Sequence, residues 1–120
     1  MLRYTLAMNA ALAAIADPHR RTLLEALRQR EATVNELAKL LPIARPGVSR
    51  HLRILREAGL VAVRQDAQRR IYSLRPEPLS ALDAWLAPYR DAWERRFLAL
   101  HTEVARGRRQ KTPAKGKPRA

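Results

Sequence analysis

The chain has 120 residues, and its 24 Lys and Arg against 11 Asp and Glu give a formal net charge of +13. This length fits one domain, and a hydrophobic content of 47% supports a small core, which excludes a wholly disordered polycation. The sequence has no cysteine, which excludes disulfides and thiolate metal ligands, and no apolar run long enough for a membrane helix. The positive charge indicates a polyanionic partner, nucleic acid ahead of an acidic membrane surface.

The N-terminal segment predicts an amphipathic helix from about Tyr4 to Ala16, with Leu6 and Leu12 among its apolar residues. A secretory signal peptide is the alternative interpretation. The segment consists mainly of alanine, a weak hydrophobe, and Asn9 interrupts it, so the helix is favoured. We therefore expect a cytoplasmic protein.

Capping residues mark the next two helices. Asp17 is a good N-cap and the following proline suits a first helical position, which predicts a second helix over about Pro18–Arg28. Thr33 and Glu36 have the spacing of a capping box and predict a short third helix, which we expect Pro42 to stop.

A fourth helix is predicted from about Arg45 to Ala58. Val48, Leu52 and Leu55 recur at spacings of four and three and form its inward face. Gly59 is the expected C-terminal stop.

After Gly59 the spacing of apolar residues changes from that of a helix to that of a β-strand. Residues 60–64 are rich in β-branched side chains, and residues 70–74 alternate polar and apolar, which predicts a two-stranded hairpin. The turn between them lacks the glycine that favours tight hairpins.

A terminal helix follows, with an apolar seam close to a heptad repeat. Pro88 lies inside the seam, and we expect it to kink the helix or to split it near Ala87. The seam consists of Leu79, Leu82, Leu86, Tyr89, Trp93, Phe97, Leu100 and Val104, with Trp85 beside it.

Residues 106–120 carry seven basic side chains, no acid and no large apolar side chain. Such a segment cannot bury enough surface to offset the entropy of ordering, so we predict a disordered basic tail behind a domain of residues 1–105. The tail would strengthen phosphate binding without reading sequence, and the alternative is a solubilising terminus.

A short capped helix, a turn and an arginine-rich helix form the pattern of a helix-turn-helix. The inward face of the fourth helix leaves Arg45, Ser49 and Arg50 exposed, and arginine suits guanine edges and phosphates. Gly47 would allow the backbone to approach DNA closely. The basic hairpin provides a second contact.

Several strings resemble ArsR-type winged helix-turn-helix repressors. They are Ala16-Asp17-Pro18-His19-Arg20-Arg21, Glu36-Leu37-Ala38, Val48-Ser49-Arg50-His51-Leu52, Leu55-Arg56-Glu57-Ala58-Gly59-Leu60-Val61 and Arg70-Ile71-Tyr72-Ser73-Leu74. The resemblance covers roughly residues 13–97 and is closest to the branch that does not sense metals. It implies a mainly α fold with a small β-hairpin, dimerising through its terminal helices, and a homodimeric bacterial repressor that binds an inverted repeat in double-stranded DNA. Ala44 and Ala67 stand where this family often has a serine cap and a wing glycine.

The resemblance assigns the recognition helix and the wing as DNA-binding segments and the terminal helices as the dimer interface. The candidate DNA-binding residues are Arg45, Pro46, Gly47, Ser49, Arg50, His51, Arg53, Arg64, Gln68, Arg69 and Arg70. The candidate interface residues are Leu6, Leu12, Leu82, Trp85, Leu86, Tyr89, Trp93, Phe97 and Leu100.

No cofactor, metal site or enzymatic activity is expected. The terminal helix offers a single histidine, His101, beside scattered acids, and a transition metal needs several nitrogen or sulfur ligands. The sequence has no Gly-rich phosphate loop, and Ser49 and His51 are two residues apart on a helix and point different ways. Two alternatives stay open: a non-specific nucleoid-type DNA-binding protein and a metal-responsive repressor.

Overall fold

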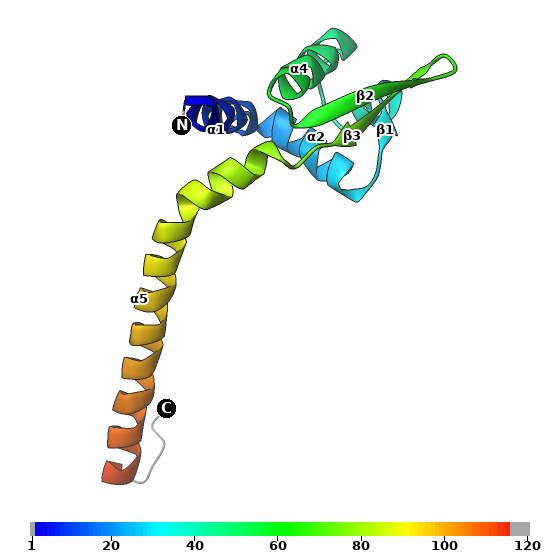
Figure 1. Ribbon diagram of the computed structural model, residues 1–120. Helices are drawn as coiled ribbons and strands as arrows, with labels where there is room; N and C mark the ends of the chain where they lie inside the picture. Colours follow the sequence, from blue (N-terminus) through cyan, green and yellow to red (C-terminus); the bar gives the residue numbers. More distant parts are fainter. Residues whose placement is uncertain (1, 116–120) are drawn as a thin grey trace. The chain divides into compact units, whose positions relative to one another are not determined.

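The computed structural model describes residues 2–115, with side-chain burial given for residues 5–107. The chain divides into two compact units, the first ending at Ala84 and the second beginning at Trp85. The division lies well before the boundary predicted at residue 105. The elements are α1 (Leu2–Ile15), α2 (Pro18–Gln29), β1 (Ala32–Thr33), α3 (Val34–Ala38), α4 (Arg45–Glu57), β2 (Val61–Asp66), β3 (Arg69–Leu74) and α5 (Pro78–Lys115) (Figure 1).

The predicted helix caps are present. Asp17 Oδ1 accepts hydrogen bonds from the backbone N–H groups of His19 at 2.8 Å and Arg20 at 3.2 Å, which starts α2. Thr33 and Glu36 form the full capping box of α3. However, α3 ends at Ala38, so Pro42 does not stop it.

The first unit contains a three-stranded antiparallel sheet in the order β1-β3-β2, which is one strand more than the predicted hairpin. The additional strand places Ala32 opposite Tyr72 and Thr33 opposite Ile71. Its origin is the capping box, because an N-cap residue has extended backbone geometry and Thr33, at φ −83° and ψ 164°, can therefore pair with a strand.

The predicted hairpin itself is confirmed, and its turn projects away from the helices of the first unit (Figure 1). Asp66 pairs with Arg69, which leaves a two-residue turn. Ala67 in this turn has a φ of 59°, a conformation that glycine adopts more easily.

The core lies among α2, α3, α4 and the sheet. The predicted inward face of α4 is confirmed, since Val48, Leu52 and Leu55 are fully buried. Leu23 from α2 and Leu37 from α3 are equally buried beside them. Burying each leucine contributes roughly 1.5–3 kcal/mol, so this packing fixes which face of α4 remains in solvent.

Gly59 ends α4 as predicted, with a φ of 79°. Its N–H donates to Arg56 O, and the Leu60 N–H donates to Leu55 O, both at 2.9 Å. This pair of bonds is the Schellman motif, which turns the chain from α4 directly into β2.

Helix α5 is uninterrupted, so of the two effects expected of Pro88, a kink or a split, the split does not occur. Pro88 and Ala84 are both exposed, and water can therefore bind the carbonyl that proline leaves without a donor. The helix also continues through residues 106–115, where a disordered tail was predicted. Residues 116–120 of that tail lie outside the described part of the chain.

Candidate DNA interface

The face of α4 opposite the core is basic. Because Val48, Leu52 and Leu55 point inward, Arg45 and Arg50 extend into solvent, as the sequence predicted. The N-cap residue of α4 is Ala44, whose side chain makes no capping hydrogen bond, so the departure noted in the sequence is confirmed.

An open groove of about 520 Å³ runs between α4, α3 and β3. Arginines line it, and the only other lining residues are small, apolar or aromatic. The lining residues are Val34, Arg45, Pro46, Ser49, Arg50, Leu52, Arg53, Arg56, Arg70 and Tyr72.

The five arginines of this groove, Arg45, Arg50, Arg53, Arg56 and Arg70, are called the groove arginines below. None of them takes part in any of the salt bridges found among the described residues. No carboxylate lines the groove. The groove therefore concentrates positive charge that the protein itself does not neutralise, and phosphate is the ligand that such guanidinium groups favour.

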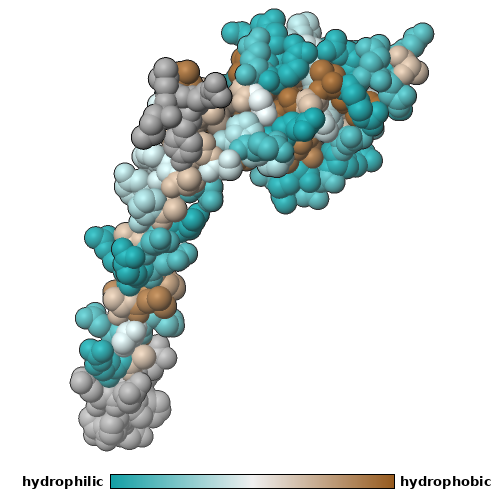
Figure 2. Space-filling model, viewed as in Figure 1, coloured by the Kyte–Doolittle hydropathy of each residue, from teal (hydrophilic) through white to brown (hydrophobic). Residues whose placement is uncertain are grey.

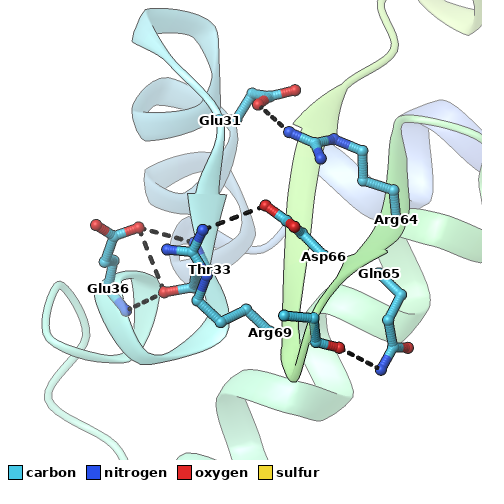
Figure 3. Close-up of polar contacts among 8 residues, drawn as sticks. Glu31, Thr33, Glu36, Arg64, Gln65, Asp66 and Arg69 are labelled. Carbon is cyan, nitrogen blue, oxygen red and sulfur yellow. Dashed lines mark hydrogen bonds and ion pairs between the residues drawn. The ribbon is translucent and has the colours of Figure 1, made fainter.

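The other two arginines of the hairpin differ from Arg70 because each has an acidic partner. Arg64 donates to Glu31 at 2.8 Å, and Arg69 donates to Asp66 at 3.3 Å (Figure 3). The Glu31 carboxylate raises the pKa of Arg64. All four side chains are half exposed or more, so the pairs are weak enough to open when a phosphate approaches.

Gly47 and His51 are placed differently from the other predicted DNA-binding residues. A Cβ on Gly47 would lie 3.2 Å from Ile43 Cδ1, so the glycine leaves room for Ile43 in the preceding turn. His51 is half-buried, and its Nδ1 lies 3.1 Å from Arg20 Nη1 on α2. Burial lowers the pKa of His51, which favours the neutral ring.

Two arginines were missing from the predicted site. Arg56 lines the groove, and its position seven residues after Ser49 puts it on the same helix face, so the helical period could have identified it. Arg20 contacts His51 across 31 residues of sequence, and no local pattern indicates that contact. Gln68 is exposed in the hairpin turn, as predicted.

The predicted interface residues form exposed apolar surfaces. Leu6 of α1 is 58% exposed, and Trp93 of α5 is 67% exposed. Figure 2 shows apolar residues on the surface of α5. Trp85 packs on Tyr89 with ring centroids 4.9 Å apart, and Trp93 stacks on Phe97 at 6.1 Å, so the aromatic rings form a stripe along α5.

Leu82 is the exception among these residues. It is 9% exposed and already buried in the protomer, so its place in the predicted interface is wrong. Leu12 and Leu86 are both 41% exposed, while Tyr89, Phe97 and Leu100 are exposed to a similar degree as Leu6.

Among the described residues, no group of three or more His, Asp or Glu side chains could hold a metal ion. None of the described helices combines the length and the hydropathy needed to cross a membrane.

Comparison with known proteins gives consistent matches. The family described as "Bacterial regulatory protein, arsR family" matches residues 17–63, which include the groove helix α4. The transcriptional regulator Rv2034 of Mycobacterium tuberculosis is 46% identical over 74 residues, 62% of this chain and 69% of that protein. The repressor SdpR of Bacillus subtilis is 33% identical over 79 residues, 66% of this chain and 88% of that protein.

Solved structures also match regulators of this family. The crystal structure of the ArsR family transcriptional regulator RHA00566 is 35% identical, with a TM-score of 0.66, and the match covers 73% of this chain and 91% of that one. The family match over residues 17–63 includes α3 and α4, two of the three elements that line the groove.

Proposed function

Because this chain belongs to the ArsR family of bacterial regulatory proteins, we propose that it is a homodimeric repressor that binds an inverted-repeat operator. The chain is a sequence-specific DNA-binding regulator of transcription, and its relatives are named as regulators and repressors, not as enzymes. The observation that supports the proposal best is the groove: five arginines without acidic partners surround the exposed face of a helix whose other face is locked into the core. As a bacterial regulator of transcription, it acts in the cytoplasm.

We assign the reading of DNA to the exposed face of α4. A helix fits the major groove, and side chains near its N-terminal end reach base edges. Arg45, Ser49 and Arg50 occupy that end, so they contact bases, while Arg53 and Arg56, further along the helix, contact phosphates. The hairpin adds phosphate contacts through Arg70, together with Arg64 and Arg69 once these release their carboxylates.

We assign dimerisation to the exposed apolar residues of α1 and α5. A protomer alone leaves Trp85, Trp93 and Phe97 in water, and a second copy would remove them from it. Residues 78–94 hold three acids and one base, whereas residues 95–115 hold seven bases and one acid. Antiparallel pairing of two α5 helices brings opposite charges together, and parallel pairing opposes like charges.

We place specific binding and dimerisation in residues 1–105 and give residues 106–120 a different role. The latter segment carries basic side chains without acids, so it adds affinity for any DNA and no sequence preference.

The test compares two DNA duplexes at physiological salt. One carries the inverted repeat selected from a randomised pool by the full-length protein, and the other has the same composition in scrambled order. We expect affinity about 10³-fold or more higher for the selected duplex, the range of specific regulators. Equal affinities would support a nucleoid-type protein instead. Repeating the titration with added Zn²⁺ and with a chelator distinguishes a metal-responsive repressor, whose affinity would change.

A further inference from the structure

One arginine outside the groove joins three helices. Arg20 lies in α2, and its Nε donates to the carbonyl oxygen of Ala14 at 2.7 Å while Nη2 donates to that of Ala13 at 3.2 Å. Both carbonyls belong to the last turn of α1, where helix carbonyls lack the usual donors four residues on, although that of Ala13 also accepts from the Ala16 N–H at 3.3 Å. The third nitrogen, Nη1, lies 3.1 Å from Nδ1 of His51 in α4.

Arg21, the next residue in α2, caps the end of α1 without reaching another of the described helices. Arg21 also donates to the end of α1, from Nη1 to the carbonyl oxygen of Ile15 at 2.9 Å. Among the described residues, Arg21 forms no hydrogen bond or ion pair with α4, so capping the end of α1 does not require one. Arg20 therefore does more than cap: one rigid guanidinium fixes the end of α1 and a side chain of α4 at the same time.

The contact with His51 depends on the protonation state of the ring. A guanidinium has only donors, so Nδ1 must carry a free lone pair in order to accept from it. Burial lowers the pKa of His51, Asp17 opposes this shift, and the positive charge of Arg20 reinforces it. His19, 5.7 Å away between ring centroids, and Arg50 on the same helix act in the same direction as Arg20.

We propose that Arg20 is a positioning residue for DNA reading, because through His51 it sets the placement of α4 relative to α1. The proposal rests on the assignment of α4 as the reading helix. His51 follows Arg50 directly, so a shift of α4 at this point moves the side chains assigned to base edges. Contacts to phosphates tolerate such a shift better than two-pronged contacts to bases, which require fixed geometry. A molecule bound to α1, such as a second copy of the chain, is thereby coupled to DNA reading.

The test uses variants that keep or remove the acceptor. His51→Asn retains an oxygen near the position of Nδ1, whereas His51→Leu removes it. Arg20→Lys keeps the charge but cannot hold three acceptors in the plane of a guanidinium. Arg28→Lys, an exposed position elsewhere on α2, is the matched control. Each full-length variant is titrated with the selected and the scrambled duplex, and its denaturant midpoint is measured in parallel.

We expect Arg20→Lys and His51→Leu to lower the ratio of specific to scrambled affinity about tenfold or more, the scale of one lost base contact. Affinity for scrambled DNA should stay unchanged in these two variants. His51→Asn and Arg28→Lys should keep the wild-type ratio of specific to scrambled affinity. The double variant Arg20→Lys/His51→Leu should have a ratio no lower than that of the single variant with the lower ratio. A lower midpoint with an unchanged ratio would reduce Arg20 to a stabilising residue and overturn the proposal.

A measurement without DNA separates this inference from the proposed function. Amide hydrogen exchange along α1 should become faster in His51→Leu, although the substitution lies in α4, and should remain as in the wild type in His51→Asn. If α1 does not respond to His51→Leu, the coupling is absent whatever the protein binds. If α1 responds but no duplex is preferred, the coupling stands and the assignment of specific DNA reading fails.

Discussion

Arg50→Ala is the most direct perturbation of the candidate interface. The Arg50 side chain is exposed, lines the groove and forms no salt bridge among those of the described residues, so its removal leaves the core intact. We expect the free energy of unfolding to change by less than about 0.5 kcal/mol, as for other surface substitutions. A two-pronged contact to a base contributes about 1–3 kcal/mol, and a homodimer loses it twice, so affinity for the selected duplex should fall about 30-fold or more.

The assay is fluorescence anisotropy with the selected and scrambled duplexes over a series of salt concentrations. If Arg50 reads a base, the ratio of affinities falls and the slope of log affinity against log salt is unchanged. If it contacts a phosphate, the slope decreases by about 0.9 for each contact and the ratio is unchanged. Arg28→Ala is the control, since Arg28 is exposed and paired with Glu25 on α2. An unaltered affinity in both Arg50→Ala and Ser49→Ala, or an equal loss in Arg28→Ala, would refute the reasoning.

Four further predictions concern the backbone, the interface, the basic end and the pH response. Because Gly59 and Ala67 both have positive φ, Gly59→Ala should destabilise the protein by about 1–2 kcal/mol, whereas Ala67→Gly should stabilise it by up to about 1 kcal/mol. Denaturant unfolding measures both changes in the free energy of unfolding. If the two substitutions change it in the same direction, the turn geometry is contradicted. Trp93→Glu places a charge on the exposed stripe of α5 and should yield folded monomers by light scattering, so a persistent dimer would exclude this interface. Removing residues 107–120 should weaken binding to both duplexes alike and flatten the salt dependence; an unchanged slope would mean that this segment does not touch DNA. The pKa of His51 is lowered in the folded state, so unfolding takes up a proton and the free energy of unfolding should decrease as the pH falls below 6.5. His51→Asn should flatten this part of the plot of stability against pH. If the plot is identical in the variant, another group titrates.

The sequence predicted best those features that depend on neighbouring residues. The capping box of Thr33 and Glu36, the buried stripe of α4 and the stop at Gly59 are local patterns, and the structure confirms each of them. Strand β1 was missed because two residues are too short for a pattern, and only the pairing of Ala32 with Tyr72 makes them a strand.

Contacts between distant segments account for the misplacement of Leu82 and the omission of Arg20. Leu82 continues the apolar seam of α5 in sequence, yet it is buried in the protomer, and the helical period alone cannot tell which turns of a helix are already covered. The helical period placed His51 in α4 correctly but gave no sign that Arg20 contacts its ring. A hydrogen bond between residues far apart in the sequence produces no periodic pattern from which it could be predicted.

The partners of the arginines explain why the net charge of +13 is a poor guide to the site. Arg20 and Arg21 donate hydrogen bonds to backbone carbonyls, and Arg64 and Arg69 pair with carboxylates. These guanidinium groups therefore already have partners in the free protein. The groove arginines have no such partners, and they surround one hollow. An arginine that bonds within the fold must exchange that bond for one to DNA, and the exchange gains little. An arginine with only water as its partner gains the full charge-assisted bond and releases the counterions of the phosphate. Affinity should therefore depend on the five groove arginines more than on the other basic side chains of the first unit, although all carry the same charge.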